Sequence, residues 1–70
     1  MKEQVSTLVS EARQLLKANQ FSSAVAKAQK ILELDSEHRE GLYLLAVSQR
    51  YLNQIELALE TLKVLQHHHA

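Results

Sequence analysis

The sequence matches itself when it is shifted by 34 residues, and this internal repeat constrains the fold more than any other feature. Turn residues, small residues and large apolar residues coincide in one register. The identical pairs include Leu8 and Leu42, Ala12 and Ala46, Asn19 and Asn53, Gln20 and Gln54, and Ala24 and Ala58. Such a repeat is typical of stacked units that complete each other's hydrophobic core. We therefore predict a single domain over residues 1–70 with two copies of one unit, at about residues 5–38 and 39–70.

Apolar residues recur in each unit at intervals of three and four, which places them on one face of an α-helix. Four helices are predicted, at about residues 3–18, 21–34, 37–52 and from 55 to at least 66. Asn19 and Asn53 mark the turn inside each unit, because asparagine tolerates the left-handed conformation that ends a helix. Ser22 or Ser23 is expected to cap the second helix and Ser36 the third.

The composition argues against several classes of protein. Lys plus Arg equals Asp plus Glu, 8 against 8, so the chain lacks the broad positive field that nucleic-acid binding requires. There is no cysteine for a disulfide or a thiolate metal site. The single glycine, Gly41, lies early in the third predicted helix, at a cost of about 1 kcal/mol against alanine. Apolar runs are too short for a membrane span and no signal peptide precedes the repeat, so we expect a soluble, cytoplasmic protein.

The sequence assembles no catalytic or metal-binding group of side chains. It has no Gly-rich phosphate loop, and no serine is paired with a base. The chain is therefore expected to bind no cofactor and to have no enzymatic activity. The three histidines at positions 67–69 point about 100° apart from one to the next on a helix, so they are not expected to converge on a metal. We interpret them as a tag remnant or as the end of the helix.

The turn and the segments beside it resemble the tetratricopeptide repeat family. The residues that carry the resemblance are Asn19-Gln20-Phe21, Ala24, Ala28 and Lys30-Ile31-Leu32-Glu33-Leu34-Asp35, and in the second unit Asn53-Gln54-Ile55, Ala58 and Leu65. The resemblance implies an all-α fold of two stacked antiparallel helix-turn-helix hairpins in a right-handed superhelix. The chain departs from the family at Leu8 and Leu42, which replace an aromatic residue, at Ser36, which replaces a proline, and at the polar residues Glu11 and Gln49.

The resemblance also implies a function, which is the binding of a peptide or a partner protein on a concave face without catalysis. The first helix of each unit would line this face. Its residues would be Ser6, Val9, Arg13, Leu16 and Lys17 from the first unit, and Glu40, Tyr43, Val47, Arg50 and Tyr51 from the second. Val9, Arg13 and Leu44 stand where chaperone-binding members grip a carboxylate, so that particular clamp is not expected. Tyr and Arg are frequent interface hot spots.

The chain stops near its last hairpin, which predicts an uncovered apolar edge formed by Leu59, Leu62, Val64 and Leu65. Such an edge is expected to mediate self-association into a homo-oligomer, or to continue into a longer array. One alternative is a non-catalytic segment of a larger enzyme, since residues 59–65 are loosely similar to the N-terminal repeats of bacterial sulfotransferases. Another is a structural dimerisation unit or a designed repeat. The sequence does not identify the partner.

Overall fold

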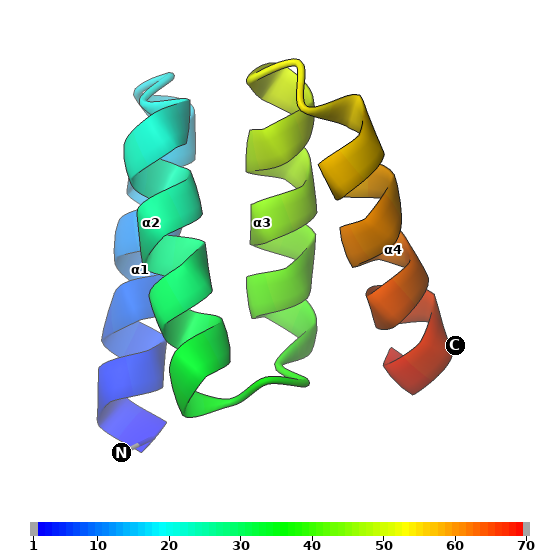
Figure 1. The fold of residues 1–70 in the computed structure, drawn as a ribbon. Helices are drawn as coiled ribbons and strands as arrows, with labels where there is room; N and C mark the ends of the chain where they lie inside the picture. Colours follow the sequence, from blue (N-terminus) through cyan, green and yellow to red (C-terminus); the bar gives the residue numbers. More distant parts are fainter. Residues whose placement is uncertain (1, 70) are drawn as a thin grey trace.

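Four α-helices make up the fold in a computed structural model that describes the backbone of residues 2–69 and the side chains of residues 4–68. The helices are α1 (Lys2–Lys17), α2 (Phe21–Leu34), α3 (Arg39–Tyr51) and α4 (Ile55–His69). Neighbouring helices run in opposite directions, so α1 and α2 form one antiparallel hairpin and α3 and α4 the other (Figure 1). The described residues contain no strand. The predicted all-α fold of two stacked helical hairpins is confirmed.

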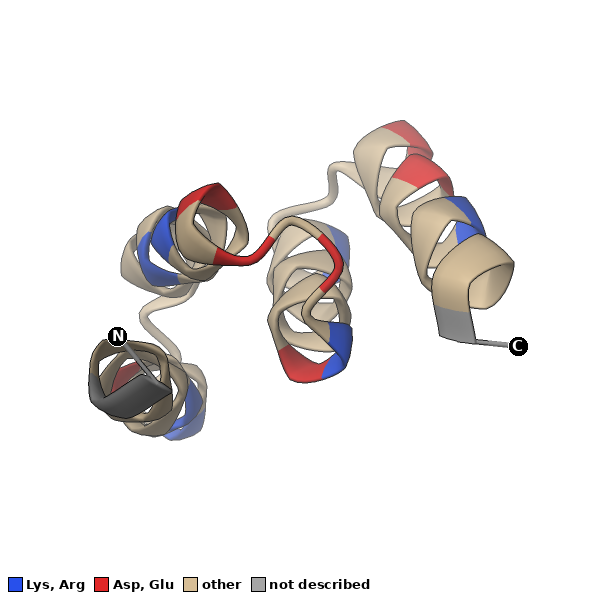
Figure 2. Cartoon of the chain, turned by 90° about the horizontal axis from the view of Figure 1, so that it is seen from below, with Lys and Arg blue, Asp and Glu red and all other residues tan. Residues whose placement is uncertain are grey.

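The two hairpins stack so that α3 packs against both α2 and α4, whereas α1 and α3 touch only lightly. Viewed along the helices, α1 and α3 lie on one side of the molecule and α2 and α4 on the other (Figure 2). One broad face is therefore built from the first helix of each hairpin. Within the part of the chain that the structure describes, no helix combines the length and the apolar character that crossing a membrane requires.

The core lies where α1, α2 and α3 meet. Its buried members are Leu8, Val9, Ala12, Ala28, Ile31, Leu44 and Leu45. Ala12 and Ala28 are completely inaccessible to solvent, as is Ala24 one turn before Ala28 on α2. Small side chains at these positions allow the two helices of the first hairpin to approach closely, and the larger apolar residues fill the space beside them.

The predicted turns inside the hairpins are confirmed, and they repeat each other in detail. Asn19 and Asn53 both adopt the left-handed conformation, with φ of 60° and 65°. The same backbone hydrogen bonds follow in both hairpins, from Asn19 N to Leu16 O and Asn53 N to Arg50 O at 3.0 Å, and from Gln20 N to Leu15 O and Gln54 N to Gln49 O at 2.8 Å. These bonds satisfy the last carbonyls of α1 and α3, as helix ends require. The internal repeat is therefore structural as well as sequential.

The expected serine cap of α2 is wrong. The residue that flanks the start of α2 is Gln20, and its side chain makes no capping hydrogen bond. Ser22 and Ser23 lie inside the first turn of α2, one and two residues after its first residue. A side chain can cap the free N–H groups of a helix only from the flanking position, and neither serine occupies it.

The expected start of α3 is also wrong, because the helix begins two residues later than predicted, after His38 rather than after Ser36. Nδ1 of His38 accepts a hydrogen bond of 3.0 Å from the backbone N–H of Gly41 and so caps the helix. Asp35 holds the residues between α2 and α3 in a turn. Its Oδ1 accepts from the N–H of Glu37 at 3.3 Å, and its carbonyl accepts from the N–H of His38 at 3.0 Å.

Gly41 marks the closest approach of α2 and α3. A Cβ atom at this position would lie 2.7 Å from Cγ2 of Ile31 and 3.3 Å from Cδ2 of Leu32. Ile31 is completely buried and β-branched, so it cannot easily turn aside. The lower helix propensity of glycine is therefore the cost of bringing these two helices together.

A buried polar contact joins α3 to α4. Gln49 is 6% exposed, and its Oε1 lies 2.8 Å from the hydroxyl of Thr61, which is 8% exposed. The same hydroxyl lies 2.9 Å from the carbonyl oxygen of Leu57. Buried polar groups are tolerated when they are hydrogen-bonded. Gln49 thus gives the second hairpin a directional contact between its helices. The equivalent residue of the first hairpin is Leu15, whose side chain cannot form a hydrogen bond.

Candidate functional site

Two adjoining hollows lie near the first turn of α3, the smaller between α1 and α3 and the larger between α3 and α4. The smaller, of about 280 Å³, is lined by Ser6, Val9, Ser10, Arg13, His38 and Glu40. The larger, of about 600 Å³, is lined by His38, Arg39, Glu40, Tyr43 and Leu65. His38 and Glu40 belong to both, so the two hollows meet at the start of α3. We name the surface formed by these residues the α1–α3 face.

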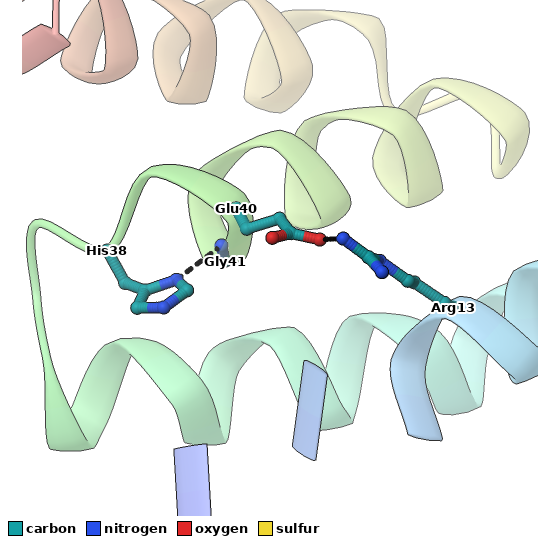
Figure 3. A network of polar contacts seen from close by, with 4 residues as sticks. All are labelled: Arg13, His38, Glu40 and Gly41. Atoms are coloured by element: carbon teal, nitrogen blue, oxygen red, sulfur yellow. Dashed lines mark hydrogen bonds and ion pairs between the residues drawn. The ribbon is translucent and has the colours of Figure 1, made fainter. Parts of the chain in front are cut away.

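A polar network occupies the middle of the α1–α3 face. The guanidinium group of Arg13 on α1 forms an ion pair with the carboxylate of Glu40 on α3, and His38 caps the same turn of α3 (Figure 3). The side chains of Arg13 and Glu40 are 58% and 38% exposed. An ion pair so accessible to water contributes about 0–1 kcal/mol to folding. Its charged groups therefore remain available to a ligand at little cost to the fold.

Five of the residues predicted for the face line its two hollows, namely Ser6, Val9, Arg13, Glu40 and Tyr43. Val9 is 8% exposed and lines the smaller hollow next to Arg13. Tyr43 lines the larger hollow and is 55% exposed. The face therefore offers an apolar base, a cation and an exposed aromatic ring on two helices that are held rigidly by the core.

The other predicted residues of the face lie outside these hollows. Lys17 and Arg50 are exposed near the C-terminal ends of α1 and α3, and Leu16 and Val47 are half-buried. Tyr51 stacks on Phe21 at the start of α2, with ring centroids 4.6 Å apart and ring planes 7° apart. Because eight residues separate Tyr51 from Tyr43, its position is turned by about 80° around the helix. This rotation directs Tyr51 toward α2.

Four residues of the face were not among those predicted, namely Ser10, His38, Arg39 and Leu65. His38 was missed because the predicted helix began before it, which hid its role as the flanking residue. Leu65 was assigned to the uncovered edge, but it is half-buried and lines the larger hollow. The signal for Leu65 is its spacing from the buried residues Ala58 and Thr61, which lie seven and four positions before it and therefore on one side of α4.

The rest of the predicted edge is accessible. Leu59, Leu62 and Val64 are 54%, 39% and 40% exposed. They do not share one side of α4, because Val64 is turned by about 140° from Leu59 around the helix axis. The four residues of the predicted edge thus point in three directions, with Leu65 toward α3, Leu59 and Leu62 away from the hairpin on one side, and Val64 on the other.

The C-terminal histidines contact the turn before α3. Nδ1 of His68 lies 2.7 Å from Oε1 of Glu37, and the ring of His67 meets that of His68 edge-on at 5.0 Å. The side chain of His69 lies outside the described residues. No group of three or more metal-binding side chains is found in the described part of the chain. His68 thus links the end of α4 to the start of α3.

The α1–α3 face combines groups that suit the recognition of a polypeptide. A guanidinium group can bind a carboxylate through two parallel hydrogen bonds, and an exposed tyrosine offers a flat apolar surface with a polar tip. A comparison of the chain with protein-family models, with curated proteins and with solved structures finds no match.

Proposed function

We propose that the chain is a protein-interaction module that binds a peptide or a segment of a partner protein on the α1–α3 face, without catalysis. The observation that carries this proposal is the pair of adjoining hollows, with Tyr43 exposed in one and Arg13 in the other. Surface tyrosine and arginine side chains contribute a large share of the energy of protein interfaces. The helices that present them are held by the core, so little ordering is required when a ligand binds.

The face favours a segment with a carboxylate and a nearby large apolar side chain. Arg13 already forms an ion pair with Glu40, and a ligand carboxylate can take the place of Glu40 in that pair. The apolar side chain of the ligand would then occupy the larger hollow, between Tyr43 and Leu65. Burying the ring of Tyr43 against it removes apolar surface from water on both partners.

We further propose that the chain is a two-unit member of the tetratricopeptide repeat family. The support comes from the internal symmetry of the molecule. The left-handed residues Asn19 and Asn53 are 34 positions apart, as are the hydrogen bonds that surround them. The first helices of the two hairpins lie on one side of the molecule and the second helices on the other, as the stacking of equivalent hairpins requires (Figure 2).

The proposed function is tested with peptides selected from a random displayed library against the wild-type chain. Their affinities are then measured by fluorescence anisotropy for Tyr43→Ala, Arg13→Ala and Lys30→Ala. Tyr43→Ala is expected to weaken binding by about 30-fold, which corresponds to about 2 kcal/mol for a hot-spot residue. Lys30, an exposed residue of α2 outside the α1–α3 face, is the control and is expected to have no effect. Equal affinities for all three variants would contradict the proposal.

A further inference from the structure

An apolar stripe runs along α4 on the side that no other helix covers. Its members are Ile55, Leu59 and Leu62, which are 47%, 54% and 39% exposed. Intervals of four and three residues place them within about 60° of each other around the helix. We name these three residues the α4 stripe. Figure 2 shows α4 at the end of the row of helices, with no further element beyond it.

The first hairpin carries an equivalent stripe, and there it is covered. At an offset of 34 residues the counterparts of the α4 stripe are Phe21, Val25 and Ala28. Phe21 stacks on Tyr51 of α3, and Ala28 belongs to the buried cluster that includes residues of α3. In this fold the stripe is therefore a surface on which a helix packs. In the first hairpin that helix is α3, whereas the α4 stripe lies exposed.

Helix α1, at the opposite end of the molecule, is poorly suited to pack on the α4 stripe of a second copy. The buried positions of α3 that include its contacts with α2 are Gly41, Leu44, Leu45 and Ser48. Their counterparts on α1 are polar and exposed, namely Thr7, Ser10, Glu11 and Gln14. Packing α1 of a second copy on the α4 stripe would take these polar groups out of water against an apolar surface. Head-to-tail stacking of copies is therefore disfavoured.

Charges beside the α4 stripe favour α4 of a second copy in an antiparallel orientation. Glu56 and Lys63 are exposed, lie seven residues apart and flank the stripe on the same side. When two α4 helices meet antiparallel about the midpoint between Leu59 and Leu62, Glu56 of each copy comes within two residues of the level of Lys63 of the other, an offset of about 3 Å that these long side chains span. A parallel arrangement would instead turn this flank toward the side of Ala58 and Leu65, which carries no charge and packs on α3.

We propose that the chain forms a two-fold symmetric homodimer through antiparallel packing of its α4 stripes. Leu59 of one copy lies beside Leu62 of the other, and two symmetric pairs of Glu56 and Lys63 set the orientation. A two-fold axis makes this contact closed, so assembly stops at two copies. The dimer leaves the α1–α3 face open in both copies, because the α4 stripe lies on a different side of the molecule.

The first test uses sedimentation velocity of the full chain over a series of concentrations. The wild type is expected to show a monomer–dimer equilibrium. Leu59→Glu is expected to lower the association constant by on the order of 100-fold, since it places two unpaired carboxylates at the centre of the interface. Leu57→Glu is the matched control, because Leu57 is 49% exposed on another side of α4. A wild type that stays monomeric at all concentrations, or equal loss of dimer in both variants, would overturn the proposal.

The second test addresses orientation by charge reversal. Glu56→Lys alone is expected to weaken the dimer by roughly 3- to 10-fold, because it sets two lysines against each other at both symmetric positions. The double variant Glu56→Lys/Lys63→Glu is expected to restore the wild-type constant. Glu33→Lys makes the same charge change at an exposed position of α2, which does not contact α4, and serves as the control. An unrestored double variant, or a Glu33→Lys variant as weak as Glu56→Lys, would refute the antiparallel contact. Tyr43→Ala is expected to leave dimerisation unchanged, which separates this proposal from the peptide-binding one.

Discussion

Replacing Gly41 by alanine sets two physical effects of opposite sign against each other. Alanine is favoured over glycine inside a helix by about 1 kcal/mol, so propensity alone predicts a more stable protein. In the structure, however, the new Cβ would lie 2.7 Å from Cγ2 of the fully buried Ile31. Overpacking of this kind costs about 1–3 kcal/mol, because α2 and α3 must separate or Ile31 must leave its rotamer. We expect the steric cost to prevail and to destabilise the protein by about 1 kcal/mol.

Thermal and urea denaturation followed by circular dichroism measure this effect. A loss of about 1 kcal/mol corresponds to a fall in Tm of roughly 4–8 °C for a domain of this size. Ile31→Leu moves the branch of the side chain away from Cβ and removes the methyl group that the new alanine side chain would meet. Gly41→Ala is therefore expected to destabilise the Ile31→Leu background by much less than the wild type, and this coupling identifies the contact. A Gly41→Ala protein that is more stable than the wild type would refute the reasoning.

Three further predictions concern local contacts, and each is measured by the change in the free energy of unfolding. Asn53→Ala is expected to cost about 1 kcal/mol and Asn53→Gly about nothing, because φ of 65° disfavours a Cβ; equal effects would contradict the role of the turn. Thr61→Val is expected to cost about 1–3 kcal/mol by leaving the buried Gln49 without its partner, and Gln49→Leu in the same chain should recover most of it. Glu40→Gln is expected to change stability by less than about 0.5 kcal/mol, since its ion pair is exposed, and a larger loss would show that the pair supports the fold.

The helices and the turns inside the hairpins follow from local rules, which is why the sequence predicts them well. The bounds of α2 and the start of α4 agree with the apolar periodicity. Asn19 and Asn53 were identified because few residue types tolerate the left-handed conformation. The start of α3 was predicted two residues early, because Ser36 and His38 both carry a side chain that can accept a capping bond.

The α1–α3 face was less predictable, because its composition depends on how each helix is rotated about its own axis. Of the residues that their position in the repeat assigned to this face, Ser6, Val9, Arg13, Glu40 and Tyr43 line its hollows. It did not reveal that Tyr51 stacks on Phe21. Helix α4 is apolar on more than one side, so periodicity alone does not tell which apolar residues face α3. The position of Leu65 follows only from the packing of α4 against α3, which the sequence pattern does not contain.

The central functional claim is that ligands bind on the α1–α3 face, and its most direct test is a map of the contact surface in solution. Backbone amide resonances of the ¹⁵N-labelled chain are recorded while a selected peptide is added. The account predicts that the perturbed amides cluster between Val9 and Arg13 and between His38 and Tyr43, with α2 largely unaffected. Perturbations confined to α2 and to the α4 stripe would contradict it.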